Sequence, residues 1–466
     1  MKNTKLIALL RTFTAAELRQ FGDFVASPFF NKRQELVQFY SLLRQCAPEF
    51  AAEQVDRQRL FQLLYPSEPF NSKQVDYLSS FLLKLAEQFI GHQHYQSDPL
   101  LPAYHQMAAL VERDLDKHYR FLHRKALNQL EQSPIRGTNY YFHRFLVANL
   151  AQLHFTKKQV RKQSEELQEA ADWLDQFYLA SKLNYCSEML DMQAMMSASY
   201  RMPLLKEIMA FLAAQTDLAL PIEIYYKIVQ AHLSEGDEAN FEVAIQLIRE
   251  HSDIFPLPEM KRLYLFAANY CARKIRQQQA QFVPIALDLY MAGIENGIAY
   301  EDGFLRHFTY KNIVRLGLTL ERYDWTEHFI KDYYPQLKEE YQQDALHYNL
   351  AELSYSRRNY DDVLSHLNQV EFSDIHYNLG ARKLLLKVYY EQQEMELLMA
   401  QIAAFRIFLQ RNKLMSSKMK ASYQNFLSLL KRIVNATPDN RPRLQPTIES
   451  TLPLTAGRWL LEKCKA

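Results

Sequence analysis

Apolar residues recur every three or four positions through most of this chain, the spacing that places them on one face of an α-helix. In one stretch, Leu346, Leu350 and Leu353 follow this spacing and predict a buried stripe. A sustained alternation of β-branched and polar residues, typical of strands, does not occur. We therefore predict an all-α fold and no strand.

The helical pattern also repeats along the sequence. Trp325, Tyr360 and Met395 each open the second helix of a predicted pair, and they follow one another at intervals of 35 residues. Repeats of two short antiparallel helices are ~34 residues long, and each pair must stack on its neighbours to bury its apolar face. We predict pairs near 221–251, 257–297, 301–333, 341–370 and 374–411, stacked antiparallel in a right-handed α-solenoid.

The stretch 346–364 resembles one tetratricopeptide (TPR) repeat. Leu350 and Ala351 match the Leu and small residue of its first helix, and Tyr360 matches the aromatic residue of its second helix. Val363 departs from the pattern, because Ala is usual at that position. The resemblance covers about 221–411 and implies a TPR-like array with a concave, ligand-facing groove. The residues that it implies for this groove are Tyr348, Glu352, Tyr355, Arg382 and Tyr389.

The tyrosines of this set have a second interpretation. Tyr348, Glu352 and Tyr355 form a stripe at helical spacing beside the leucine stripe. Aromatic stripes of this kind usually belong to the core, so the tyrosines could instead pack on the next helical pair. The sequence leaves both interpretations open.

Helix-boundary residues divide the remainder of the chain. We predict an N-terminal helical bundle over 1–98, a region of long helices over 99–220, the repeat array with its capping helices over 221–435, and a C-terminal tail with a short helix over 436–466. Both ends resemble a family of uncharacterised bacterial helical proteins, which implies a helical fold and no particular activity. The residues that carry this resemblance are 27–32 (SPFFNK), 63–66 (LLYP) and 459–463 (WLLEK).

Composition narrows the compartment and the chemistry. Cys46, Cys186, Cys271 and Cys464 are far apart in the 466 residues and form no Cys-x-x-Cys pair, which indicates a reducing compartment. No apolar run approaches the ~20 residues of a membrane span. We predict a cytoplasmic protein that does not enter the membrane.

Motifs that carry enzymatic chemistry are missing from the sequence. The chain has no Gly-x-x-x-x-Gly-Lys, Gly-x-Gly-x-x-Gly or His-Glu-x-x-His sequence, and its 14 histidines do not cluster with metal-ligand spacing. The adjacent Asp361 and Asp362 are explained by the first turn of a helix, where negative charge is favourable. We predict no enzymatic activity, no cofactor and no metal.

The net charge of +2 favours neither nucleic acid nor acidic partners, but two stretches are basic. Residues 117–162 contain ten Lys or Arg residues and one acidic residue, Glu131. Residues 397–438 contain no Asp or Glu, and their basic residues are Arg406, Arg411, Lys413, Lys418, Lys420, Lys431 and Arg432.

These observations support two functional hypotheses. The first is a non-enzymatic scaffold for protein–protein interaction that binds a partner helix or an extended peptide in the groove. The alternative is a nucleic-acid-associated protein that uses the basic surfaces 117–162 and 406–432. Solvated helix faces would explain both basic stretches without any ligand.

Overall fold

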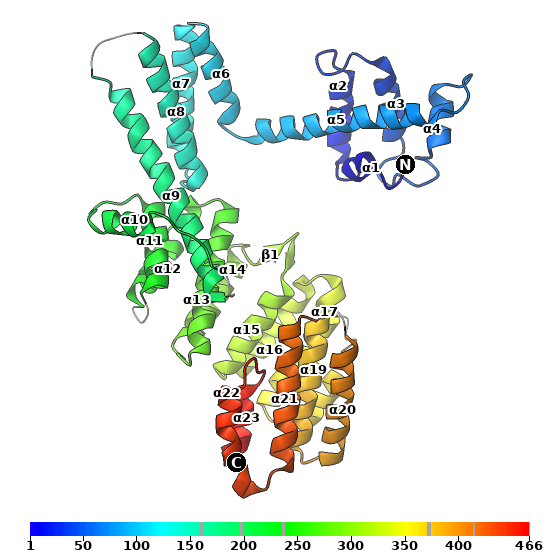
Figure 1. Cartoon of the computed structure of the whole chain (residues 1–466), viewed down its shortest axis with the longest axis vertical. Helices are drawn as coiled ribbons and strands as arrows, with labels where there is room; N and C mark the ends of the chain where they lie inside the picture. Colours follow the sequence, from blue (N-terminus) through cyan, green and yellow to red (C-terminus); the bar gives the residue numbers. More distant parts are fainter. Residues whose placement is uncertain (159–162, 196–198, 235–237, 371–373, 413–414, 466) are drawn as a thin grey trace. The chain divides into compact units, whose positions relative to one another are not determined.

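The computed structural model describes residues 1–158, 163–195, 199–234, 238–370, 374–412 and 415–465. These residues form 23 α-helices and one pair of two-residue strands, which confirms the all-α class (Figure 1). Along them, every helix is too short or too polar to cross a lipid bilayer. The chain divides into two compact units, Met1–Leu183 with Thr216–Glu223 and Asn184–Gln215 with Ile224–Ala466.

The first unit begins with helices that share one apolar core, in which Phe21, Phe39, Phe61 and Leu82 are buried. The predicted capping box is present, because Thr14 accepts a hydrogen bond from the Glu17 amide and the Glu17 carboxylate accepts one from the Thr14 amide. The helices of this core are α1 (Lys5–Leu10), α2 (Ala15–Ala26), α3 (Gln34–Arg44), α4 (Arg57–Leu64) and α5 (Ser72–Ser97).

A second apolar core of this unit contains Met107, Tyr119, Leu130 and Val147. It is built by α6 (Leu101–Glu112), α7 (Asp116–Gln132) and α8 (Thr138–Lys157), which contact one another. They are followed by α9 (Glu165–Met195), whose residues from position 184 onward belong to the second unit.

Successive helical pairs make up most of the second unit, and α11 to α20 match the predicted pairs, except that α11 begins one residue early at Leu220 and α17 two residues early at Glu339. Helices α18 and α20 begin at the predicted residues Tyr360 and Met395, and Trp325 lies in the first turn of α16. The helices are α10 (Leu205–Ala213), α11 (Leu220–Leu233), α12 (Ala239–Glu250), η1 (Ser252–Ile254), α13 (Leu257–Arg276), α14 (Phe282–Glu295), α15 (His307–Thr319), α16 (Tyr323–Tyr333), η2 (Tyr334–Gln336), α17 (Glu339–Ser356), α18 (Tyr360–Leu367), α19 (Ile375–Glu391) and α20 (Met395–Arg411).

Small residues allow paired helices to approach closely. A Cβ atom at Gly317 of α15 would lie 2.4 Å from the Thr326 hydroxyl oxygen and 3.1 Å from the Trp325 ring, both of α16. In the next pair, Ala351 of α17 and Val363 of α18 are fully buried. The two helices of each pair can pack closely here because the residue on the first helix, Gly317 or Ala351, has no side-chain atom beyond Cβ.

The four pairs from α13 to α20 share one type of helix end. After each first helix, one non-glycine residue adopts a left-handed conformation, with φ between 56° and 66°. The next amide donates to the carbonyl five residues back, which is the Schellman cap. These bonds join Gln279 to Lys274, Arg322 to Gly317, Asn359 to Ser354 and Glu394 to Tyr389, and the left-handed residues are Gln278, Glu321, Arg358 and Gln393.

The prediction that the chain has no strand was wrong for four residues. Strands β1 (Tyr300–Glu301) and β2 (Phe304–Leu305) pair antiparallel. The turn between them consists of Asp302 and Gly303, both at positive φ. Asp-Gly favours the tight turn whose twist matches a hairpin, and this local preference prevails in a segment too short to show alternation.

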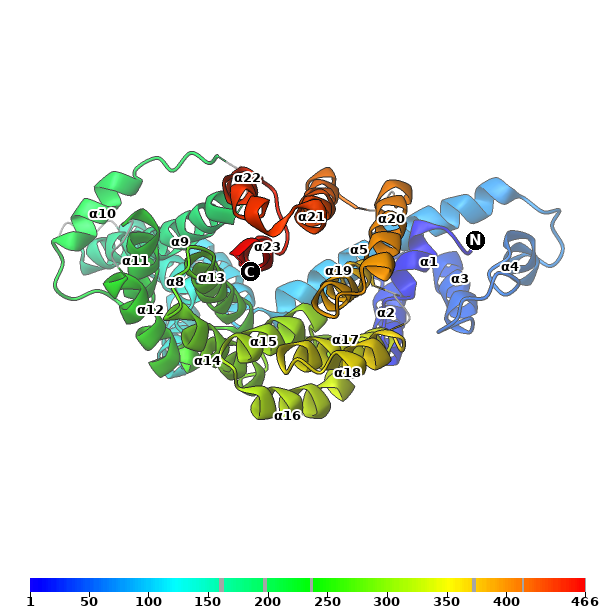
Figure 2. The ribbon, with the colours of Figure 1, turned by 90° about the horizontal axis from the view of Figure 1, so that it is seen from below.

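The C-terminal helices cover one side of the row of pairs. In Figure 2, α13 to α20 follow a curved row, and α21 (Ser417–Asn435) and α23 (Gly457–Lys465) lie on its inner side. Phe426 and Trp459 are buried in one core with Leu386 of α19 and Phe405 of α20. The connecting segment contains η3 (Pro438–Asn440), η4 (Pro442–Leu444) and α22 (Gln445–Ser450).

Candidate functional site

A pocket of about 400 Å³ opens on the inner side of the second unit. Three first helices, α15, α17 and α19, form its base, and α17 contacts both α15 and α19. Tyr423 of α21 and Thr455, which precedes α23, line the opposite side. The residues of the base are Lys311, Asn312, Val314, Arg315, Leu318, Tyr348, Asn349, Glu352, Gly380, Lys383 and Lys387.

Each of the three helices contributes two polar side chains at a spacing of four residues. These pairs are Lys311 and Arg315 on α15, Tyr348 and Glu352 on α17, and Lys383 and Lys387 on α19. Residues four apart lie on one face of a helix, one above the other. Because the three helices are neighbours, the pairs form a charged layer across the pocket.

Tyr348 and Glu352 form the centre of the pocket. The buried Tyr348 hydroxyl donates a hydrogen bond to the Glu352 carboxylate. The tyrosine ring lies against the backbone of α19, where a Cβ at Gly380 would be 2.7 Å from its Cε2 atom. Burial, and then the neighbouring Glu352 charge, raise the pKa of Tyr348 well above its usual range, so the hydroxyl stays protonated and remains a donor.

The ammonium group of Lys311 lies among aromatic rings. Its Nζ atom is 4.5 Å from the centroid of the Tyr348 ring and 5.0 Å from that of Tyr377. Burial lowers the pKa of Lys311 to about 8, and the positive charges of Lys383 and Arg315 add to this shift. The negative charges of Glu352 and Asp374 oppose it.

Lys387, which also lines the pocket, has a similar environment. Its Nζ atom lies 5.3 Å from the centroid of the Tyr355 ring and 5.5 Å from that of Trp459. Burial and Lys383 lower the pKa of Lys387 to about 8, against the opposing charges of Glu352, Glu462 and Glu391. Both lysines therefore lie in a site where positive charge is not fully compensated.

Among the described residues that line the pocket, Glu352 is the only one with a carboxylate. Burial raises its pKa, but Lys383, Lys387, the Tyr348 hydroxyl and Lys311 outweigh burial, so the net shift is downward and Glu352 is ionised. Within the described residues, Lys311, Lys383 and Lys387 make no hydrogen bond and no ion pair. Four basic groups thus face one carboxylate.

The predicted groove residues separate into two sets. Tyr348 and Glu352 line the pocket, and Tyr355 lies beside it, where its hydroxyl donates to Glu391 at 3.2 Å. The Trp459 indole and the Lys463 ammonium of α23 donate to the same Glu391 carboxylate, at 3.1 and 2.8 Å. The chain's own C-terminal helix α23 therefore packs beside Tyr355, one of the predicted groove residues.

Arg382 and Tyr389 lie on the other face of α19. The Arg382 guanidinium is 4.5 Å from the centroid of the Phe408 ring of α20, and its Nε atom donates to Asn378 at 2.8 Å. Tyr389 packs against the C-terminal apolar core. The five residues do not line one pocket, because a helix turns by about 100° per residue and these two belong to a different register from Lys383.

Sequence reasoning missed the lysines of the pocket. Lys311 and Lys383 are 72 residues apart, close to two repeat lengths, and each is followed four residues later by another basic residue, Arg315 or Lys387. This recurrence was visible in the sequence, but lysine on a helix is usually solvated and each pair alone is unremarkable in composition.

The basic stretch 117–162 contains several paired charges. Lys157 forms an ion pair with Asp114 at 2.6 Å, and Lys158 forms one with Asp116 at 2.7 Å. Both acids precede the stretch in sequence, so its composition alone overstates its free charge. Residues 161 and 162 lie outside the described residues.

The stretch 406–432 has more exposed charge. Arg411, Lys418 and Arg432 are exposed, whereas Arg406, Lys420 and Lys431 are half-buried. The six side chains make no ion pair with the described residues. The seventh predicted residue of this surface, Lys413, lies outside the described residues.

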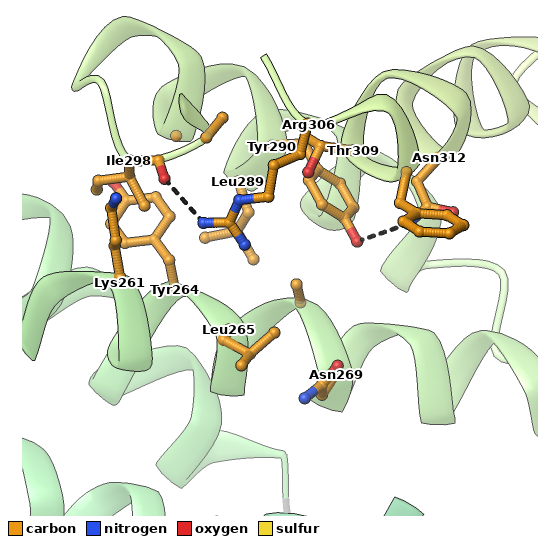
Figure 3. Close-up of a pocket in the computed structure, with 14 residues that line it drawn as sticks. Lys261, Tyr264, Leu265, Asn269, Leu289, Tyr290, Ile298, Arg306, Thr309 and Asn312 are labelled. Atoms are coloured by element: carbon orange, nitrogen blue, oxygen red, sulfur yellow. Dashed lines mark hydrogen bonds between the residues drawn. The ribbon is translucent and has the colours of Figure 1, made fainter. Parts of the chain in front are cut away.

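A second pocket of about 290 Å³ lies between α13, α14, the hairpin and α15 (Figure 3). Its wall is mainly apolar and includes Leu265 and Leu289. The Arg306 guanidinium reaches into it and donates to the Ile298 carbonyl at 3.3 Å, and the Asn312 amide donates to the Tyr290 hydroxyl at 3.2 Å (Figure 3). Arg306 and Asn312 thus bond to the chain itself, unlike the lysines of the charged pocket.

Comparisons with protein-family models, curated proteins and solved structures give no match to this chain. The described residues contain no group of three or more His, Cys, Asp or Glu side chains placed to bind a metal ion. We therefore choose the charged pocket of α15, α17 and α19 as the candidate site from its geometry and charge alone.

Proposed function

We propose that this chain is a non-enzymatic protein-interaction scaffold, a right-handed TPR-like α-solenoid that binds a segment of a partner protein at the charged pocket. The observation that carries the proposal is the set of Lys311, Lys383 and Lys387, which line one pocket and make no ion pair with the described residues. The three side chains are half-buried, and partly desolvated charges without a close partner are enriched at functional sites.

Two further observations support a repeat scaffold. The first helix of each of four successive pairs ends in the same Schellman cap, which is the local recurrence expected of a repeat. First helices α15, α17 and α19 contact one another in succession, so equivalent positions of successive pairs lie side by side. On such a surface, each first helix presents one row of side chains to a ligand.

An extended segment suits the pocket better than a helix. A helix with its side chains is ~10–12 Å across, and α21 and α23 already occupy the inner side of the row (Figure 2). A pocket of about 400 Å³ has room for one or two side chains of a partner. We propose that an extended peptide places an acidic side chain among the lysines.

The test compares partner recovery by the wild-type chain and two variants in a cell extract. Lys383→Gln with Lys387→Gln removes two charges of the pocket, and Lys206→Gln removes an exposed charge of α10 as a control. Proteins recovered by the wild type and the control should be missing from the double variant, with helicity by circular dichroism unchanged. Recovery of the same proteins by the double variant would contradict the proposal.

The nucleic-acid alternative keeps some support from the surface 406–432, whose described basic residues make no ion pair with the described residues. Its affinity for duplex DNA should fall with salt at a log–log slope of about −0.9 for each phosphate neutralised. Titration of labelled DNA and RNA at about 50 mM salt decides it, because several phosphate contacts give measurable binding at that ionic strength. No binding at micromolar protein would remove this alternative.

We also propose a cytoplasmic location. Cys46, Cys186, Cys271 and Cys464 are all buried free thiols, which fits a reducing compartment. Fractionation of cells with an antibody against the chain would test this, and recovery outside the cytoplasm would contradict it.

A further inference from the structure

We propose that the charged pocket is a phosphoryl site, in which the ammonium groups of Lys311, Lys383 and Lys387 hold a doubly charged phosphoryl oxyanion. This deepens the proposed function and rests on it for the premise that the pocket faces a ligand. The phosphoryl group could belong to a phosphorylated residue of a partner or to a free phosphate compound, and the experiment distinguishes the two sources.

The charge balance of the pocket favours a multiply charged anion. Lys311, Arg315, Lys383 and Lys387 face the single carboxylate of Glu352, which leaves a balance of +3 when all five groups are ionised. A carboxylate ligand would neutralise one charge, whereas a phosphoryl group carries about −1.5 to −2 at pH 7. The phosphoryl group therefore relieves more of the repulsion between the lysines.

The donors of the pocket match the acceptors of a phosphoryl group. Each ammonium has three N–H donors, and those of Lys311, Lys383 and Lys387 have no partner within the described residues. A phosphoryl group attached through one oxygen offers three acceptor oxygens. Lysine acts on phosphate as a point charge and needs no bidentate geometry, so three ammonium groups from two helices can share one group.

The walls of the pocket strengthen such contacts. The buried Tyr348 ring lies beneath Lys311, and the half-buried Tyr423 closes the opposite side. Hydrogen bonds between charged groups are stronger where water is partly excluded. The lowered pKa of Lys311 and of Lys387 agrees with this environment, since an anion between them would restore the charged form.

A structural network of charges is the competing explanation, and the pocket fits it less well. Such a network stabilises a fold when each buried charge has an opposite partner at close range. Here no described ammonium of the pocket lies within ion-pair distance of Glu352, whose carboxylate instead accepts from Tyr348. Glu352 offsets part of the positive charge while leaving the lysines available.

The experiment measures binding of inorganic phosphate and of pyrophosphate to the purified full-length chain by isothermal titration calorimetry in a chloride buffer at pH 7. The peptide arm uses two mixtures with randomised flanks, one with phosphoserine and one with serine at the centre. Preferential binding of the phosphoserine mixture assigns the group to a partner protein. Binding of the inorganic anions without that preference assigns it to a free phosphate compound.

Three variants should affect the affinity for phosphate in different ways. Lys383→Gln with Lys387→Gln should weaken binding at least about tenfold, because hydrogen bonds to charged groups are lost. Glu352→Gln keeps the side-chain shape but removes the repelling charge, so binding should tighten several-fold. The control Lys206→Gln, at an exposed position of α10 outside both candidate surfaces, should bind as the wild type does.

The outcomes separate this inference from the proposed function. No saturable binding of either inorganic anion up to ~10 mM, together with no preference for the phosphoserine mixture, would overturn the phosphoryl site. Unchanged or weaker binding by Glu352→Gln would overturn it as well, even where the lysine variant folds poorly. Partner recovery that survives phosphatase treatment of the extract would leave the scaffold and exclude a phosphorylated partner residue.

Discussion

Replacing Gly317 by alanine should destabilise the second unit, whereas replacing Gly293 by alanine should stabilise it. Both glycines are buried within helices, Gly317 in α15 and Gly293 in α14. A Cβ at Gly317 would lie 2.4 Å from the Thr326 hydroxyl oxygen, whereas a Cβ at Gly293 would meet Tyr264 at an ordinary contact of 3.7 Å. The same substitution thus meets opposite conditions in neighbouring pairs.

The expected change in the free energy of unfolding is the sum of two contributions. Alanine is favoured over glycine inside a helix by about 1 kcal/mol, and this term is common to both variants. Overpacking a filled site costs about 1–3 kcal/mol, and Thr326 cannot easily move because it is fully buried and its hydroxyl donates to the Arg322 carbonyl at 2.8 Å. We expect Gly317→Ala to lose up to about 2 kcal/mol and Gly293→Ala to gain up to about 1 kcal/mol.

The assay is urea denaturation of the full chain followed by tryptophan fluorescence. The Trp325 ring would lie 3.1 Å from the new Cβ at Gly317, so its emission reports on this site. The chain has two compact units, so the transition that contains Trp325 should be analysed separately if two are seen. Equal stabilisation by both variants would show that α15 and α16 are not as close at Gly317 as described.

Two other predictions concern the charged pocket. Gly380→Ala should displace the Tyr348 ring, which would lie 2.7 Å from the new Cβ, so both stability in urea and phosphate affinity should fall; unchanged affinity would show that the position of Tyr348 does not matter. Lys311→Met with Lys387→Met should stabilise the second unit at pH 7, and this gain should shrink as the pH rises from 8 towards 10. The reason is that the pKa of each lysine is about 8 in the folded chain and ~10.4 when unfolded, so wild-type stability itself rises through that window. Urea titrations at several pH values check this, and a gain that is the same at every pH would contradict it.

The helices and their grouping into pairs could be predicted because helix formation depends on residues that are close in the sequence. Apolar spacing of three to four residues marks a buried helix face wherever it occurs, and the starts of α18 and α20 at Tyr360 and Met395 follow from it. The hairpin of β1 and β2 escaped prediction because two-residue strands are too short to show alternation. The shared helix ends were also hidden, since residues such as Glu321 and Arg358 adopt a conformation that sequence assigns to glycine.

The candidate site depends on contacts between distant parts of the chain. Helical spacing places Lys383 and Lys387 on one face of α19, but it cannot say whether that face meets solvent or a neighbouring helix. Arg382 lies on the other face of α19, against Phe408 of α20, although the resemblance to a repeat predicted it for the groove. Only the packing of α19 on α17 and α20 decides between the two faces.

The C-terminal segment shows the same division most clearly. Its sequence predicts a short helix that contains Trp459, and α23 is that helix. That this helix lies on the inner side of the row, with Trp459 and Lys463 bonded to Glu391, is a contact across about 70 residues of chain. The sequence by itself determined an all-helical chain of paired helices, because helix formation and the burial of one face depend on neighbouring residues. Tertiary structure alone decided which lysines line the same pocket, because the charged pocket forms where three helices and the C-terminal segment pack together.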